Sequence, residues 1–189
     1  MASDKIMIIR HAEKPAADGS VQGVTAAGAT NAEELIVRGW QRSGALVRFF
    51  APLDGEFAQP GLATPNTIFT SQVAHHSASL RPQHTVLELA TLLGTVPGFQ
   101  FNTQYPKGDE SSLVTAAMDA QGPVLIAWEH QAIPAIVKAI VGNSTPYPPI
   151  WPDRFDLVWI LDRQAAGAWE FSQVPQLLLS GDSPQVVPI

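Results

Sequence analysis

Two arginines and two histidines stand where an apolar run ends or a helical pattern begins. Arg10 and His11 directly follow an apolar run. Arg81 opens a helical pattern, and His130 follows a second apolar run. A histidine that attacks a phosphoryl group must lie in line with the leaving oxygen, and fixed positive charge must surround the transferring oxygens. Arginine suits the second task, because its planar guanidinium is always charged and donates two parallel hydrogen bonds to phosphate.

The elements that must position these side chains form an alternation of strands and helices. The short apolar run from Lys5 to Arg10 predicts a buried strand, and Val124 to Trp128 is the clearest core strand. Such an alternation implies an α/β fold, a three-layer α/β/α sandwich with a mostly parallel central sheet. Ligands bind such sheets outside the carboxyl ends of the strands, where His11 and His130 stand.

The remaining pattern fills in this architecture. Thr25 is expected to cap a long helix that reaches Phe50, because apolar residues recur on one face from Ala32 onward. Trp151, in a Pro-rich stretch, is the tryptophan expected to lie outside the core. The other expected strands are Thr67 to Ser71, Phe99 to Phe101, Leu157 to Leu161 and Trp169 to Val174. The other expected helices are Arg81 to Leu93, Ser111 to Ala120 and Ile133 to Val141.

Composition places the chain among ordinary globular proteins. Its 189 residues can bury one sizeable core, so we expect a single domain over residues 1–189. Hydrophobic residues make up 46% and charged residues 15%, which is far from the composition of a disordered chain. Cysteine is absent, which excludes disulfides, thiolate zinc sites and cysteine nucleophiles.

Charge and hydropathy exclude several kinds of partner. The net charge is −6, and the 11 Lys and Arg residues are scattered, whereas a nucleic-acid surface needs clustered basic residues. No stretch approaches the ~20 apolar residues of a membrane span, and the first residues, MASDKIMIIR, are too weakly apolar for a signal peptide. We therefore expect a cytoplasmic protein without nucleic-acid or membrane partners, which holds any phosphate in a local pocket.

Four segments, in the same order, resemble the histidine phosphatase superfamily, also called the phosphoglycerate-mutase-like family. IIRHAEKP is similar to the strand and Arg-His-Gly or Arg-His-Ala motif that open its members. GVTAAGATNAEEL looks like their Leu-Thr-x-x-Gly helix start, and SLRPQHTVLELATLLG like their Ser-x-x-x-Arg-x-x-Gln-Thr segment. VLIAWEHQAIPAIV is similar to the strand and histidine that complete the pocket.

The resemblance implies a role for each matching residue. His11 would be the nucleophile that becomes phosphohistidine. Arg10, Arg81 and His130 would bind and polarise the phosphate. The fold implied is the phosphoglycerate-mutase-like sandwich, and the activity implied is that of a metal-independent phosphatase.

The general acid is harder to place. In one branch of the family it is a carboxylate well downstream of the second arginine, where Glu110 and its neighbour Asp109 stand. In the other branch an Asp directly follows the last histidine, but Gln131 stands there and cannot release a proton usefully near neutral pH. Glu129 precedes that histidine, although strand alternation predicts that its side chain points the other way. We rank Glu110 first, Glu129 second and Asp109 third, noting that helix starts favour acids for structural reasons alone.

Other side chains near these motifs have weaker claims. Lys14 and His76 are candidates for substrate binding, although an exposed lysine or a loop histidine is more often only solvated. Some family members have a polar residue where Ala17 stands, so that part of the pocket is filled differently here or left open. The spacing of His75, His76 and His84 matches no standard ligand pattern, so we expect no metal and no cofactor.

The leading hypothesis is a phosphatase that hydrolyses a phosphomonoester through a phosphohistidine intermediate. One alternative is a phosphate-binding or protein-interaction module of the same fold that has lost turnover. Another is a phosphohistidine protein phosphatase, whose leaving nitrogen needs a carboxylic acid less. The substrate would be a small phosphorylated molecule or a phosphoprotein, and the sequence leaves the oligomeric state open.

Overall fold

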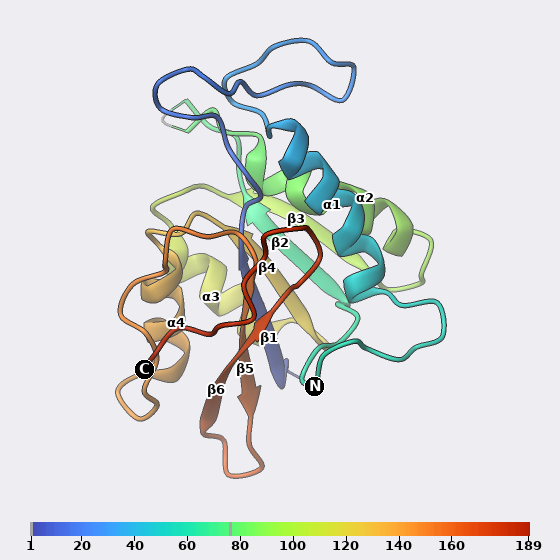
Figure 1. The fold of residues 1–189 in the computed structure, drawn as a ribbon. Coiled ribbons are helices and arrows are strands. Elements are labelled where there is room, and N and C mark those ends of the chain that lie inside the picture. The colour runs from blue at the N-terminus through green and yellow to red at the C-terminus, as the bar shows by residue number, and fades with distance from the viewer. Residues whose placement is uncertain (1, 76) are drawn as a thin grey trace.

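The central sheet places the site-bearing strands next to one another. The computed structural model describes residues 2–75 and 77–189 (Figure 1). Its 6-stranded sheet has the order β3-β2-β4-β1-β5-β6. The strands are β1 (Lys5–Arg10), β2 (Thr67–Ser71), β3 (Gln100–Tyr105), β4 (Val124–Trp128), β5 (Leu157–Arg163) and β6 (Trp169–Pro175). β1 to β4 run parallel, β5 is antiparallel to β1, and β6 is antiparallel to β5. The carboxyl ends of β1, β2 and β4 therefore meet at one edge.

Helices cover both faces of the sheet, as Figure 1 shows. α1 (Val37–Phe50) and α2 (Arg81–Leu93) lie on one face, and α3 (Glu110–Asp119) and α4 (Ile133–Val141) on the other. Side chains of β1 alternate between the two cores: Ile6 and Ile8 pack with α3 and α4, whereas Met7 and Ile9 pack with α1 and α2. The expected three-layer α/β/α sandwich is confirmed. Within the described ranges, no helix is long and apolar enough to cross a membrane.

The segment from Thr25 to Ile36 corrects the prediction of one long helix, because helical structure begins only at Val37. The Thr25 hydroxyl accepts a hydrogen bond from the Ala29 N–H at 3.1 Å. The Asn31 carboxamide accepts one at 3.0 Å from the N–H two residues later. Short polar side chains thus satisfy the backbone in turns, in competition with a helix.

Trp151 is a second correction, because only 2% of it is exposed. Its ring centroid lies 4.7 Å from that of Trp159 on β5. Its indole N–H donates to the Arg154 carbonyl at 3.0 Å. The Pro-rich segment therefore folds back over the sheet and buries its tryptophan in the core.

A buried ion network ties the loop after β1 to the C-terminal segment. Arg42, on α1, donates at 2.8 Å to both Glu13 and Asp182. The exposed fractions of these side chains are 2%, 8% and 3%. Burial raises the pKa of Asp182, but hydrogen bonds from Arg42 and from the Leu179 N–H outweigh it, so the pKa falls below its usual value. The carboxylate is therefore charged at neutral pH.

Replacing the cation of this network tests its contribution to stability. We expect Arg42→Met to lower the free energy of unfolding by about 3 kcal/mol at pH 7, because two buried carboxylates lose their buried partner and keep only the more exposed Arg38. Arg48→Met is the control on the same helix. Arg48 is exposed and makes one hydrogen bond, to the Ala51 carbonyl, so its replacement should cost less than about 0.5 kcal/mol. Urea unfolding measures both, and equal small losses would contradict a structural role for the network.

Candidate active site

Backbone hydrogen bonds fix the segment that carries the two central residues. The His11 N–H donates to the Trp128 carbonyl at 2.9 Å, which joins the ends of β1 and β4. The Ala12 N–H donates to the buried Thr85 hydroxyl at 2.7 Å. Because Thr85 lies one turn after Arg81 on α2, the same segment is held against the start of that helix. The end of β1, the end of β4 and the start of α2, which are far apart in the sequence, are therefore held together by these hydrogen bonds.

His11 is buried, with 6% exposed, and has a defined tautomer. Its Nδ1 lies 2.8 Å from the Ala12 carbonyl oxygen. A carbonyl can only accept, so Nδ1 carries the proton and Nε2 keeps a free lone pair. Burial lowers the pKa of His11 to about 3, assisted by the nearby charges of Arg10 and Arg81. The ring is therefore neutral at neutral pH, as a nucleophile must be.

Arg10 is held by contacts that the sequence pattern did not indicate. Its guanidinium carbon lies 4.0 Å from the centroid of the Phe155 ring, a cation–π geometry. One terminal nitrogen donates to the Asp153 carboxylate at 3.0 Å and to the Arg154 carbonyl at 3.3 Å. Phe155 also approaches His11, with 6.1 Å between ring centroids. The Arg10 side chain is 1% exposed, whereas that of Asp153 is 94% exposed.

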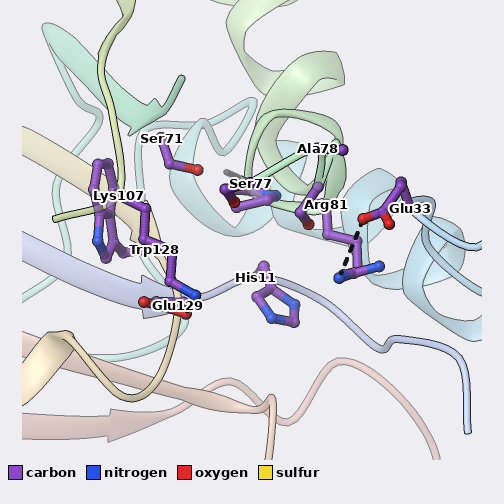
Figure 2. Close-up of a pocket in the computed structure, with 11 residues that line it drawn as sticks. His11, Glu33, Ser71, Ser77, Ala78, Arg81, Lys107, Trp128 and Glu129 are labelled. Carbon is purple, nitrogen blue, oxygen red and sulfur yellow. Dashed lines mark ion pairs between the residues drawn. The ribbon is translucent and has the colours of Figure 1, made fainter. Parts of the chain in front are cut away.

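Arg81 is oriented by the loop that replaces the expected long helix. One terminal nitrogen donates to the Ala32 carbonyl at 2.8 Å. The other lies 3.8 Å from the Glu33 carboxylate, the ion pair dashed in Figure 2. The irregular segment thus supplies a carbonyl and a carboxylate that a continuous helix would not present.

His130 lies half-buried after the end of β4. Burial lowers its pKa, and the charges of Arg10 and Lys14 act in the same direction. A neutral imidazole has one ring N–H to donate. Lys14 itself is exposed.

Three of the four predicted site residues carry a buried nitrogen without a partner. Within residues 2–75 and 77–189, the buried side-chain nitrogens and oxygens that lack a hydrogen-bond partner are Arg10 Nε, Arg81 Nε, His130 Nδ1, Thr70 Oγ1 and Trp159 Nε1. Buried polar groups in proteins nearly always have a partner. The two arginines lie close enough to the neutral His11 to shift its pKa, and Arg10 acts on His130 in the same way. Unpartnered nitrogens on these residues suit an anion with several oxygens.

Two cavities open beside these residues. Figure 2 shows the smaller, polar pocket, with His11, Arg81 and Glu129 around it. Hydroxyl groups of three serines and the ammonium group of a lysine also line it: Ser71, Ser77, Ser79 and Lys107. The larger groove is lined at one end by Arg10, His130 and Lys14. The four central residues therefore divide between two adjoining cavities.

The acid candidates occupy different surroundings. One Glu110 carboxylate oxygen accepts hydrogen bonds at 3.1 Å from the Trp128 indole and from the Gly108 N–H. Asp109 is the N-cap residue of α3. Glu129, by contrast, lines the pocket of His11 and forms an ion pair with Lys107 (Figure 2). The strand ends at Trp128, so the alternation that would turn Glu129 away does not extend to it.

The remaining candidates have mixed outcomes. His76 lies outside the described residues. Ala17 and Lys14 line the larger groove. The His84 Nδ1–H donates to the buried Glu34 carboxylate at 2.6 Å, which joins α2 to the irregular loop. Among the described residues, no group of three or more histidine, cysteine and acidic side chains could hold a metal ion.

Asp153 and Phe155 are the residues that the sequence analysis missed. They follow a Pro-rich stretch far from every matching motif, and neither residue type has a spacing that would single it out. The sequence contains no signal by which they could have been found, because their contact with Arg10 depends on how the chain returns from α4 to β5.

Comparison with known proteins bears on the fold. No protein-family model and no curated protein matches the chain. Among solved structures, the protein histidine phosphatase SixA complexed with tungstate is similar at a TM-score of 0.53 and 14% identity, over 91% of this chain and 97% of that one. A putative alpha-ribazole-5'-P phosphatase from Escherichia coli is similar at a TM-score of 0.54 and 12% identity, over 92% and 96%. On these similarities, the chain shares its fold with these two phosphatases.

Proposed function

We propose that this protein is a phosphatase that hydrolyses a phosphomonoester through a phosphohistidine formed on His11. The observation that carries the proposal is the set of buried, unpartnered nitrogens on Arg10, Arg81 and His130 beside a neutral His11. Phosphate oxygens are the acceptors that such donors fit best, since arginine matches their geometry and charge. The shared fold with a protein histidine phosphatase supports the same chemistry.

The first step transfers the phosphoryl group to the protein. His11 Nε2 uses its lone pair to form a bond to phosphorus while the bond from phosphorus to the leaving oxygen breaks. The leaving oxygen takes a proton from an acid and departs as an alcohol. Arg10, Arg81 and His130 donate to the three equatorial oxygens, whose charge they stabilise without reorganising.

The second step releases phosphate. The conjugate base of the acid removes a proton from water, whose oxygen attacks phosphorus as the bond to His11 breaks. The electron pair returns to Nε2, so His11 is again neutral. Its hydrogen bond from Nδ1 to the Ala12 carbonyl keeps the same tautomer through both steps.

Glu129 is the carboxylate best placed to be that acid, because it lines the pocket of His11. Its ion pair with Lys107 orients the group. Glu110 is engaged by the Trp128 indole and a backbone N–H, contacts that suit a structural role at the start of α3.

A phosphohistidine protein phosphatase is the second candidate. Both carboxylates are engaged, Glu110 by hydrogen bonds and Glu129 by its ion pair with Lys107, which favours this candidate because an imidazole leaves a phosphoryl group with less help from an acid. One solved structure with this fold is itself a protein histidine phosphatase. A phosphohistidine peptide assayed beside a phosphotyrosine peptide separates the two candidates.

Loss of the nucleophile is the first test. We expect His11→Ala to lower hydrolysis of 4-nitrophenyl phosphate about 1,000-fold or more, because no other group replaces the attacking nitrogen. His75→Ala, at an exposed loop histidine, should leave activity unchanged. Alkaline quenching of the wild-type reaction should trap a phosphorylated histidine that His11→Ala lacks. Vanadate binding without any turnover by the wild type would instead indicate a phosphate-binding module.

The acid can be assigned from the leaving group. We expect Glu129→Gln to lower kcat/KM for an alkyl phosphate about 100-fold, because the alkoxide needs a proton. The loss for 4-nitrophenyl phosphate should be much smaller, since nitrophenolate leaves unprotonated. Glu110→Gln should show no such dependence on the leaving group. The opposite ranking of the two variants would return the role to Glu110.

Asp153 should compete with phosphate for Arg10. The exposed carboxylate accepts from the guanidinium at 3.0 Å and adds negative charge beside the anion site. We expect Asp153→Asn to tighten vanadate inhibition roughly fivefold, the effect of removing about 1 kcal/mol of repulsion. Weaker inhibition in this variant would mean that Asp153 instead holds Arg10 in its binding position.

A further inference from the structure

The larger cavity is mostly apolar, and we call it the apolar groove. Its walls are three pairs of residues: Ala16 and Ala17 after β1, Pro134 and Ala135 on α4, and Pro149 and Ile150 in the Pro-rich segment. The cavity volume is about 1090 Å³, against about 270 Å³ for the polar pocket. That volume accommodates a ring system of drug-like size.

Charge in the groove gathers where it joins the site. Arg10, Lys14, His130 and Asp153 line that part of the groove, and Arg10 and His130 are the residues with unpartnered nitrogens. Apart from these four, the groove-lining residues that the structure describes carry no charged side chain. An occupant with an anionic phosphate at one end and an apolar body fits this distribution.

A ligand that covers the outer wall of the groove, at Ile150, would remove the most apolar surface from water. Ile150 is 73% exposed although it faces the groove beside the buried Trp151. Apolar surface removed from water contributes roughly 25 cal/mol per Å². Four prolines line the groove, and the flat face of an aromatic ring packs well against proline rings.

We infer that the apolar groove binds the leaving group of the substrate, and that this group is aromatic. The inference rests on the proposed function, because the phosphate held by Arg10 and His130 sets the position of the ring. Asp153, 94% exposed at the same end, disfavours a leaving group that carries a second negative charge. The substrate class is therefore an aryl phosphate with an uncharged ring system.

The polar pocket suits the polar atoms of the reaction, among them the leaving oxygen that Glu129 protonates, rather than the ring. Three serine hydroxyls, Lys107 and Glu129 line it, and its small volume leaves room for water or a compact polar group. A bulky ring there would lose the hydration of those groups without replacing their hydrogen bonds. The two cavities thus differ enough for binding to distinguish them.

Phosphonates test the groove without turnover, because their carbon–phosphorus bond is not hydrolysed. Calorimetry would compare naphthylmethylphosphonate with methylphosphonate on the full chain. We expect the naphthyl compound to bind the wild type at least tenfold more tightly. Ile150→Ser should lower that ratio roughly fivefold by removing an apolar wall. Leu53→Ser, at an 85% exposed leucine in the 51–65 loop, is the matched control and should keep the wild-type ratio.

The outcomes separate the two proposals. Equal affinity of the wild type for both phosphonates would overturn the inference that the groove binds the ring, while leaving the phosphate site in place. An Ile150→Ser ratio equal to that of Leu53→Ser would do the same, since the ring would then bind elsewhere. Failure of both phosphonates to bind would count against the phosphate site, and with it the proposed function.

Discussion

The peptide between His11 and Ala12 holds the candidate site together. The His11 N–H donates to the Trp128 carbonyl and the Ala12 N–H to the Thr85 hydroxyl, so this short segment is fixed to β4 and to α2. The Ala12 carbonyl in turn fixes the tautomer of His11. Arg10 belongs to a strand and Arg81 to a helix, and these hydrogen bonds fix the positions of the two arginines relative to each other. The strand order, the shape of the loop after β1 and the charges around His11 all bear on the position of this segment.

Much of this arrangement was predictable from local pattern. Buried parallel strands are continuous apolar runs, so β1 and β4 were identified, together with the polar residues at their ends. α2 agrees with its prediction from Arg81 to Leu93, because its apolar spacing is regular and Gly94 ends it. The prediction of a helix from Thr25 was wrong, because the spacing of apolar residues does not reveal where polar side chains form hydrogen bonds with the nearby backbone.

The less predictable parts of the site depend on tertiary contacts. Strand alternation predicted that Glu129 points away from the pocket. The strand ends one residue earlier, at Trp128, so the alternation does not apply to Glu129. Asp153 and Phe155 reach Arg10 because antiparallel β5 lies beside β1, which brings the Pro-rich segment back to the carboxyl edge of the sheet. No local pattern encodes that return. The roles of His11, Arg10, Arg81 and His130 remain predictions that the geometry supports.

That returning segment has a consequence for how recognition and rate are related. The same short stretch forms a wall of the groove at Pro149 and Ile150 and holds Arg10 through the Phe155 ring and the Arg154 carbonyl. A leaving group bound against that wall would contact the same segment that holds the Arg10 guanidinium, so its contacts and the position of Arg10 would be linked. Binding energy gained far from the reacting atoms is then expressed in turnover as well as in affinity. Under the proposed function, selectivity and turnover would then depend on the same few residues of this segment.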